Sequence, residues 1–278
     1  MKTRLLTALG MAVIGIPILI FSKYIVFALT VAVLSLVAVY EMFRTVGIEK
    51  KYLISVPAYL AAFAFPFLSY FLASEHTFGY LLVCVAGLFA YLVYTFFVAV
   101  FLKGALAFSE LSQAFCIATY IIFSFTSISF MRYMNVKTGL WSFVLVLVCA
   151  WGSDVFAYFT GRFFGRHKLI PEVSPKKTVE GAIGGILSAT GLAILYGFIV
   201  SKTTELVPNY IVLAVSGFVL SAVSQIGDLI ASLIKREHGI KDYGNIFPGH
   251  GGVMDRFDSV LSITTILMAI CLIFPPFM

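Results

Sequence analysis

The stretch "SLIKREHGIKDYGNIFPGHGGVMDRFDS", residues 232–259, separates two long apolar segments of the chain. It contains ten charged or histidine residues, although only 12% of the chain is charged and 61% is hydrophobic. The apolar segments on either side are long enough to cross a hydrocarbon core of ~30 Å, whereas the charged stretch must lie outside it. This contrast predicts a membrane protein whose polar chemistry gathers in loops and at the ends of spans.

The same alternation runs through the whole chain. The mean hydropathy is +1.03, and the charged fraction is far below the quarter or so that is usual for soluble domains. The sequence therefore predicts an all-α polytopic membrane protein with about nine transmembrane helices, at residues 4–22, 24–41, 52–74, 78–102, 111–131, 139–160, 180–200, 207–234 and 258–277. The first segment lacks a small-x-small cleavage site, so we expect a retained helix and not a signal peptide.

The positions of Lys and Arg predict the orientation in the membrane. Of the nineteen basic residues, four lie on one side of the predicted membrane, and they are Lys23, Arg132, Lys137 and Lys202. The other fifteen, which include Lys2, Arg4 and Lys103, lie on the side of the N-terminus. Because cytoplasmic loops carry an excess of Lys and Arg, this bias predicts a cytosolic N-terminus and a C-terminus on the far side.

No internal repeat or soluble domain is visible, so we expect residues 1–278 to form a single membrane-embedded unit. Residues 1–138 carry no recognisable motif, and residues 139–278 hold the predicted catalytic spans and loops. The net charge of +6 is explained by topology and does not indicate nucleic-acid binding, because no aromatic-basic module accompanies it. The cysteines lack metal-ligand spacing and are predicted to be buried free thiols: Cys84, Cys116, Cys149 and Cys271.

A carboxylate inside the sixth predicted span marks the first polar region. Asp154 lies two turns before the cytosolic end, and Tyr158 and Arg162 follow on the same helix face. A charge inside a span costs at least ~2.5 kcal/mol, so Asp154 should face protein, water or an ion. A structural pair with Arg162 or Tyr158 is the alternative. Gly161 and Gly165 would let another backbone come close.

The segment "SPKKT" then precedes the seventh predicted span. Its hydroxyl and ammonium groups, together with the free amides of a helix N-terminus, are typical of a phosphate site. The candidate substrate-binding residues here are Ser174, Lys176, Lys177 and Thr178. The alternative is ordinary flanking charge with a helix cap at Ser174 or Thr178.

The second polar region surrounds the opening stretch. Ser224, Asp228, Ser232 and Lys235 recur on one face of the eighth predicted span, and Asp255 and Asp258 lie at the start of the ninth. Hard carboxylate oxygens without Cys ligands favour Mg²⁺, which usually binds through one or two carboxylates and substrate phosphates. The glycines of "PGHGG" would let the backbone approach a ligand. His250 could donate a hydrogen bond to a phosphate or act as an acid, although a lone loop histidine more often does neither.

The pattern resembles the signature of the phosphatidate cytidylyltransferases (CDP-diacylglycerol synthases). The residues that carry the resemblance are Ser232, Ile234, Lys235, Arg236, Lys241, Asp242, Gly244, Phe247, Pro248, His250, Gly251, Gly252, Asp255, Arg256 and Asp258. The upstream segments "DVFAYFTGRFFGRHKL" and "VSPKKTVEG" are also similar to those of the family. The motifs cover only the C-terminal half of the chain.

The resemblance implies that CTP and phosphatidic acid give CDP-diacylglycerol and pyrophosphate with Mg²⁺, in a homodimer with a polar cavity open to cytosol and lipid. It also implies a second, monovalent cation such as K⁺. By position, Asp228 and Asp255 are the candidate metal ligands, and the candidate catalytic residues are Asp228, Asp255, Asp258, Lys235 and Arg236. The candidate substrate-binding residues are Asp154, Ser232, Lys241, His250 and Arg256, together with those of "SPKKT".

Two alternatives stay open from the residues alone. The acceptor would be another lipid phosphate, or the chain would be an ion-coupled transporter with Asp154 and Asp228 as coupling carboxylates. Transporter sites lie near the midplane, often within inverted repeats, whereas these acids lie towards one surface. A purely structural membrane protein would give the charges no reason to converge. The expected location is the bacterial inner membrane, with the active site facing the cytosol.

Overall fold

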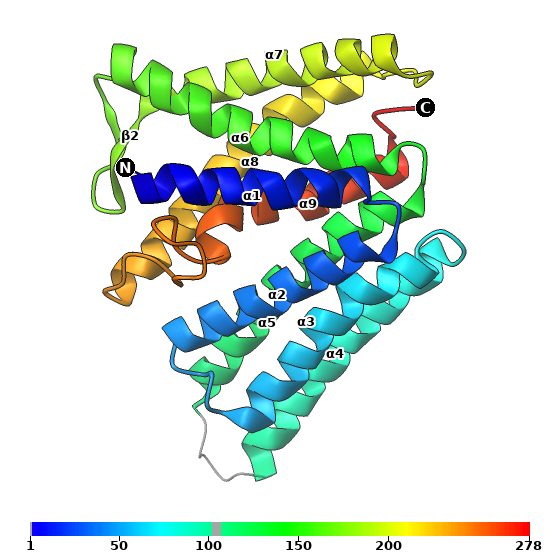
Figure 1. The fold of residues 1–278 in the computed structure, drawn as a ribbon. Helices are drawn as coiled ribbons and strands as arrows, with labels where there is room; N and C mark the ends of the chain where they lie inside the picture. Colours follow the sequence, from blue (N-terminus) through cyan, green and yellow to red (C-terminus); the bar gives the residue numbers. More distant parts are fainter. Residues whose placement is uncertain (1, 102–106) are drawn as a thin grey trace. The chain divides into compact units, whose positions relative to one another are not determined.

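The computed structural model describes residues 2–101 and 107–278, with side chains from Leu6 onwards. Lys103 and the side chains of Lys2 and Arg4, which entered the predicted charge bias, lie outside the described part. Within it, the chain forms nine α-helices and one β-hairpin (Figure 1). They are α1 (Lys2–Ile20), α2 (Ile25–Thr45), α3 (Tyr52–Leu72), α4 (Thr77–Phe101), α5 (Phe108–Met134), α6 (Gly139–Phe164), β1 (Lys168–Ile170), β2 (Ser174–Thr178), α7 (Val179–Thr203), α8 (Tyr210–Glu237) and α9 (Met254–Ile273).

The predicted helical membrane fold is confirmed. In the described residues, the eight helices α2 to α9 are long and apolar enough to cross a membrane. Each predicted span corresponds to one helix, but α1 counts only as a shorter apolar helix over Leu6–Ile20, so its crossing stays a prediction. The main boundary error is at α9, which begins at Met254 and not at residue 258. Its first turn is polar, and hydropathy therefore missed it.

The chain divides into two compact units. The first contains Met1–Met134 and Asp242–Arg256, and the second contains Asn135–Lys241 and Phe257–Met278. The first boundary between the units, after Met134, lies close to residue 138, where the sequence analysis placed the end of the spans without a recognisable motif. The glycine-rich part of the opening stretch belongs to the first unit, although the helices that flank it belong largely to the second.

In the first unit, α2, α3 and α5 pack against one another, and α4 lies against α3 and α5 (Figure 1). Large side chains such as Phe43, Phe125 and Phe130 are fully buried among them. Of the cysteines here, Cys84 is buried as predicted, but Cys116 is exposed on α5. The prediction for Cys116 was wrong because hydropathy does not tell which face of an apolar helix packs against protein.

In the second unit, α7 packs against both α6 and α8, and these two helices also contact each other (Figure 1). The close approach that Gly161 was expected to allow is present, since its added Cβ would lie 3.5 Å from the Cα of Gly181 on α7. Small residues at such crossings bring backbones together, which is the usual means of packing helices in membranes. Backbone hydrogen bonds between Val207 and Met278 also tie the α7–α8 connection to the last residues. Cys149 and Cys271 are buried free thiols, as predicted.

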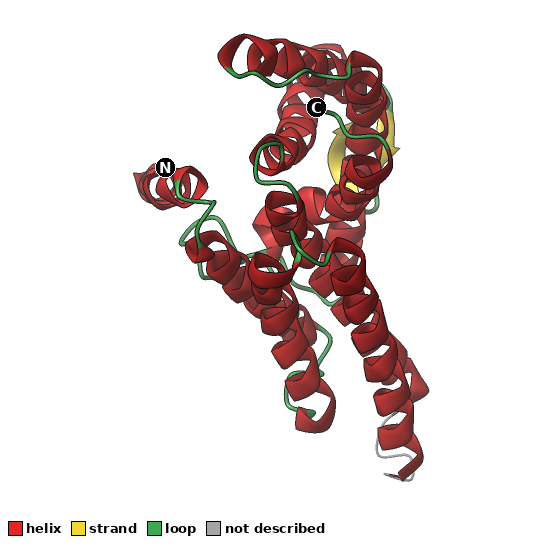
Figure 2. Ribbon diagram, turned by 90° about the vertical axis from the view of Figure 1, so that its right-hand side faces the viewer, coloured by secondary structure: helices red, strands yellow, loops and turns green. Residues whose placement is uncertain are grey.

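The short hairpin between α6 and α7 was not predicted (Figure 2). The antiparallel pairing aligns Lys168 with Thr178 and Ile170 with Ser174. The sequence interpretation treated this segment as a loop, because strands of three and five residues are too short to show an alternating pattern. The hairpin matters for function because successive side chains of a strand point to opposite faces.

Candidate active site

A close crossing of α8 and α9 builds the polar centre of the second unit. A Cβ added to Gly227 would lie 2.5 Å from the Cβ of Ser262 and 3.0 Å from the carbonyl oxygen of Asp258. Only a residue without a side chain allows the two helices to approach this closely. Asp228, the next residue on α8, is thereby brought near Asp258 in the first turns of α9.

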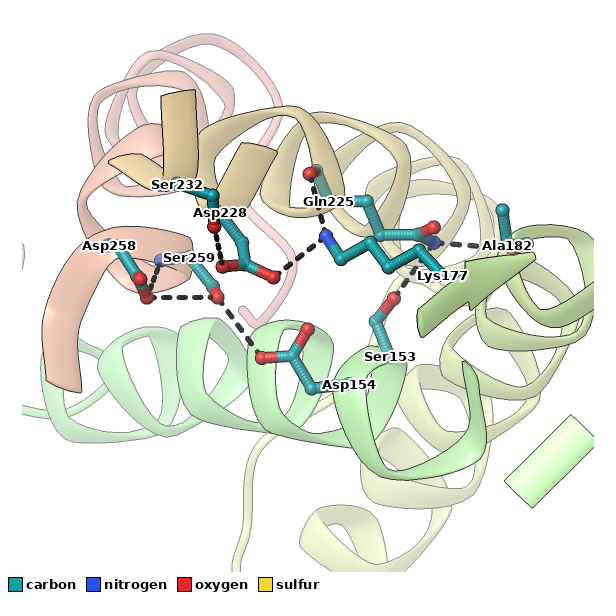
Figure 3. A network of polar contacts seen from close by, with 9 residues as sticks. All are labelled: Ser153, Asp154, Lys177, Ala182, Gln225, Asp228, Ser232, Asp258 and Ser259. Atoms are coloured by element: carbon teal, nitrogen blue, oxygen red, sulfur yellow. Dashed lines mark hydrogen bonds and ion pairs between the residues drawn. The ribbon is translucent and has the colours of Figure 1, made fainter. Parts of the chain in front are cut away.

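An ion pair links Asp228 to the hairpin (Figure 3). The Lys177 ammonium lies 2.7 Å from Oδ2 of Asp228 and also donates to the carbonyl oxygen of Gln225 at 3.3 Å. The side chains of Lys177 and Asp228 are 24% and 29% exposed, so solvent or a ligand can reach both. Lys177 reaches Asp228 from β2 and is only partly exposed, whereas the preceding Lys176 is exposed.

Two further carboxylates converge on one hydroxyl. Ser259 donates to Oδ2 of Asp154 at 3.0 Å and also lies 3.3 Å from Oδ1 of Asp258. A hydroxyl has a single proton to donate, so the two carboxylates share it. The backbone N–H of Ser259 donates to the same oxygen of Asp258 at 2.8 Å. Ser259 itself is buried, so its position is fixed by packing.

A buried amide holds the other side of this centre. The side chain of Gln225 donates to the hydroxyl of Ser153 on α6 and to the carbonyl oxygen of Ala182 on α7, each at 3.2 Å. Ser153 and Gln225 are both buried. Because Gln225 lies one turn before Asp228 on α8, these bonds fix the rotation of α8 and the direction of Asp228.

The centre is rich in negative charge. The charge of Asp228 acts on both Asp154 and Asp258, and Lys177 and Lys235 offset it only in part. Within the described residues, no three acidic, histidine or cysteine side chains are arranged around one point as metal ligands. Mg²⁺ does not require such a cage, because it is usually held by one or two carboxylates with water and substrate phosphates. Asp228, a partly exposed hard-oxygen donor, fits this type of site.

Asp154 does not pair with Tyr158 or Arg162, the two residues on its own helix that the structural alternative named. Arg162 donates to the hydroxyl of Tyr158 at 3.1 Å, while the recorded hydrogen-bond partner of Asp154 is Ser259 on α9. Asp154 therefore faces other carboxylates and not a cation on its own helix. The bond from Ser259 offsets part of the ~2.5 kcal/mol or more that a carboxylate in a span costs, and the role of Asp154 in binding substrate stays a prediction.

Of the two interpretations of the "SPKKT" segment, the helix cap is present in the structure. Thr178 is the N-cap of α7, and its hydroxyl accepts the N–H of Gly181 at 3.1 Å. That bond is the expected helix cap. Lys177 reaches the polar centre, whereas Ser174 pairs with Ile170 within the hairpin and Lys176 is exposed. The role of Ser174, Lys176 and Thr178 in binding a phosphate stays a prediction.

The remaining predicted residues lie around the ends of α8 and α9. Ser232 is 3.5 Å from Oδ1 of Asp228, at the limit of a hydrogen bond. Lys235 is close enough to Asp258 for its charge to act there. In the second unit Arg236 and Lys241 are exposed, as is Arg256 in the first. The buried Nδ1 of His250 has no hydrogen-bond partner among the described residues.

A second group of carboxylates lies in the first unit. Oδ2 of Asp255 accepts the backbone N–H groups of Tyr243 at 2.7 Å and Gly252 at 3.0 Å. Glu41 of α2 accepts the N–H groups of Val253 at 3.1 Å and Met254 at 2.9 Å. Both carboxylates are buried, and both hold the backbone of the glycine-rich stretch. The glycines of "PGHGG" accordingly make room for protein carboxylates.

The two predicted metal ligands therefore have different surroundings. Asp228 is partly exposed and paired with a lysine, whereas Asp255 is buried and bound to backbone N–H groups. Their assignment as metal ligands stays a prediction, because they belong to different units.

Four residues that contact or position the carboxylates were not predicted from the sequence: Glu41, Ser153, Gln225 and Ser259. Ser259 directly follows Asp258, and Gln225 lies in the polar end of α8, so both had a weak signal. Glu41 had a stronger one, since it is an acidic residue within an apolar run and the cost argument applied to Asp154 applies to it equally.

Comparison with known proteins places these groups in a family context. Residues 2–274 match the Cytidylyltransferase family. A Bacillus subtilis protein named phosphatidate cytidylyltransferase is 34% identical over 99% of this chain and 98% of its own length. Proteins with the same name from Staphylococcus epidermidis and Staphylococcus haemolyticus are 33% and 34% identical, over 96% of this chain and 97% of theirs.

The similarity extends over both units, so it includes the N-terminal helices in which sequence analysis found no motif. It also decides between the classes left open above, because it indicates an enzyme and not an ion-coupled transporter. The chain belongs to the cytidylyltransferase family and is a nucleotidyltransferase of the membrane.

Proposed function

We propose that this protein transfers the cytidylyl group of CTP to phosphatidic acid, giving CDP-diacylglycerol and pyrophosphate for phospholipid synthesis. The observation that carries the proposal is the partly exposed Lys177–Asp228 ion pair beside Asp154 and Asp258. Such a centre offers a cation to a polyphosphate and hard oxygens to its metal ion. The names of the relatives support the choice of phosphatidate as acceptor.

The reaction needs charge neutralisation and alignment more than proton transfer. An oxygen of the lipid phosphate attacks the α-phosphorus of CTP and forms a new P–O bond. The bond between the α-phosphorus and the bridging oxygen of the β-phosphate breaks, and pyrophosphate leaves with the electron pair. Because the attacking phosphate is already anionic near neutral pH, no strong general base is required.

The basic side chains supply the neutralisation in this proposal. Lys177 would exchange its bond with Asp228 for a phosphate oxygen, since both side chains are accessible. Lys235, Arg236, Lys241 and Arg256 would bind the CTP phosphates, and Lys176 the nucleotide or the lipid headgroup. Asp154 and Asp258, joined through Ser259, would line the polar cavity and keep its field negative.

Mg²⁺ is the cofactor that this chemistry calls for, with a monovalent cation such as K⁺ as a second ion. By resemblance to the family, Asp228 and Asp255 would hold the divalent ion, and the hard-oxygen character of both fits it. A bound Mg²⁺ would offset the charge that develops on the leaving pyrophosphate. A homodimer in the bacterial inner membrane, with the site open to the cytosol, would give access to both CTP and the lipid.

The test is an activity assay on detergent-purified protein. With Mg²⁺, CTP and phosphatidic acid should give CDP-diacylglycerol and pyrophosphate, and EDTA should stop the reaction until Mg²⁺ is added back in excess. In parallel assays, other nucleotides replace CTP and other lipid phosphates replace phosphatidic acid, so that the specificity for each substrate is tested separately. CTP binding without transfer to phosphatidic acid would overturn the acceptor, and full turnover in EDTA would overturn the metal requirement.

A further inference from the structure

Glu41 is a buried acidic residue that the proposed function does not use. It lies in the last turns of α2, and only 2% of its surface is exposed. Its two carboxylate oxygens each accept one backbone hydrogen bond, Oε1 from Val253 and Oε2 from Met254. These N–H groups stand at the start of α9, so Glu41 caps that helix from a distant part of the chain.

The stretch before α9 is shaped around this carboxylate. A Cβ added to either Gly244 or Gly252 would lie 2.2 Å from Oε1 of Glu41. No side chain larger than hydrogen fits at such a distance. The two glycines, one at each end of the loop, therefore bring the backbone into contact with Glu41 from both sides.

Two neighbouring charges complete the anchor. Arg44, one turn after Glu41, donates to the carbonyl oxygen of Tyr243 at 3.1 Å. Asp255 accepts the N–H of Tyr243 and that of Gly252. The loop from residue 243 to 255 is thus fastened at both ends by side chains, while Asn245, Ile246 and Pro248 between them are exposed. Gly249 and Gly251 have positive φ angles, which only glycine adopts readily.

We propose that Glu41 is a positioning residue of this transferase. It fixes the glycine-rich loop and the first turn of α9, and with them the direction of Asp255 and the place of Arg256. A carboxylate is needed at position 41 because two backbone N–H groups, those of Val253 and Met254, point at it and require acceptors, which an apolar side chain does not offer. The proposal rests on the proposed cytidylyl transfer, since it assumes that this loop serves the reaction.

The test compares Glu41→Gln with Glu110→Gln. Both changes remove one negative charge from the first unit, but Glu110 pairs with Lys51 at the surface. The comparison uses only protein that elutes as a single folded species. We expect Glu41→Gln to lower kcat by about 10- to 100-fold and to leave KM for CTP within about threefold of wild type. Misplacement of a substrate-binding group by about 1 Å has an effect of this size. Hydrogen exchange should quicken at residues 243–255 and not in α3. Glu110→Gln should leave both unchanged.

A paired substitution tests the contact itself. Gly252→Ala should impair the enzyme because its methyl group meets the Glu41 carboxylate. In a Glu41→Ala background that carboxylate is absent, so Gly252→Ala should add little further loss. Additive effects of the two changes would contradict the proposed contact.

Other outcomes separate this inference from the proposed function. If Glu41→Gln lowers the yield of folded protein but leaves kcat of the folded fraction within twofold, Glu41 is a stability residue and the proposal is wrong. If Glu41→Gln does not fold, Arg44→Met replaces it, because Arg44 is exposed and the change removes only the bond to Tyr243. A wild-type protein without turnover would overturn the proposed function, while the exchange measurement would still decide whether Glu41 anchors the loop.

Discussion

The two carboxylate groups of this protein differ in what they bind. Glu41 and Asp255 in the first unit are buried, and the partners recorded for their oxygens are backbone N–H groups. Asp154, Asp228 and Asp258 in the second unit contact hydroxyl or ammonium side chains, with one backbone N–H, that of Ser259, on Asp258, and Asp228 is partly exposed. Backbone partners cannot leave without unfolding the loop, whereas side-chain partners can rotate away. The first arrangement suits holding a structure and the second suits exchanging ligands.

The sharpest test of this difference removes one carboxylate from each group. If Asp228 holds the proposed Mg²⁺, Asp228→Ala should lower turnover by about 1,000-fold or more, with little change in Tm. Asp255→Ala should lower turnover and also Tm, because two buried N–H groups lose their acceptor at about 1–3 kcal/mol each. Thermal unfolding in detergent and initial rates measure both effects.

Glu172→Gln, in the exposed turn of the hairpin, is the control for a lost negative charge and should behave as wild type. An unchanged Tm in Asp255→Ala, or a large fall in Asp228→Ala, would contradict the division between a holding group and an exchanging group.

The two neighbouring lysines of the hairpin, Lys176 and Lys177, give the next largest expected effect on turnover. Lys177→Met should lower turnover by about 100-fold, the size seen when one donor to a developing charge is removed. Lys176→Met removes the same charge from the neighbouring residue, which is exposed, and should cost less than about tenfold because solvent screens it. Steady-state rates as a function of CTP concentration decide this. Equal losses in the two variants would show that the ion pair with Asp228 is not what makes Lys177 important.

The crossing of α8 and α9 can be loosened without touching a charge. Gly227→Ala places a methyl group against Ser262, and overpacking of this kind costs about 1–3 kcal/mol. We expect a lower Tm and a drop in turnover of about tenfold, because α8 must shift and carry Asp228 with it. Gly191→Ala on α7 is the matched control, since no atom lies within 4 Å of its added Cβ. If the two variants had similar Tm values and turnover, the α8–α9 crossing would not be the feature that positions Asp228.

The smallest expected effect comes from the shared hydroxyl. Ser259→Ala deletes the hydroxyl bonds to Asp154 and Asp258 and leaves the backbone N–H bond to Asp258. A hydrogen bond to a charged group contributes about 1.5–3 kcal/mol to stability. Because Ser259 holds the carboxylates and does not contact substrate in this proposal, turnover should fall by only about two- to tenfold, or about 0.4–1.4 kcal/mol in the barrier. Initial rates and Tm measure it, with Ser201→Ala as control because the Ser201 hydroxyl bonds only within α7. A loss as large as that of Asp228→Ala would place Ser259 in the chemistry itself.

The sequence predicted the helices well because a run of apolar residues is a local property. It also predicted Asp154, Asp228 and Asp258, since each is a charge near or inside a span and helical spacing assigns it a face. The bonds that join them were not predictable. Ser259 connects two helices, and Gln225 connects three, and spacing along one helix does not tell which residues face each other across a crossing.

Glu41 and the hairpin show two different reasons for failure. The partners of Glu41 lie 212 and 213 residues away in the sequence, so its role appears only when the chain is folded. The hairpin was missed because its strands are too short for a periodic signal. Lys177, a candidate because a cation before a helix suits phosphate chemistry, does lie beside Asp228, and its role in binding a phosphate stays a prediction.

The separation of Glu41 from its partners also has a consequence for biosynthesis. A ribosome adds about 5–20 residues per second, so roughly 10–40 s pass between the synthesis of Glu41 and that of Val253, 212 residues later. During this interval the Glu41 carboxylate lacks its final hydrogen-bond donors, the N–H groups of Val253 and Met254, while α2 is already apolar enough to insert. The first unit is therefore completed late, by one of the last segments to leave the ribosome, and the nascent chain must keep Glu41 hydrated until then.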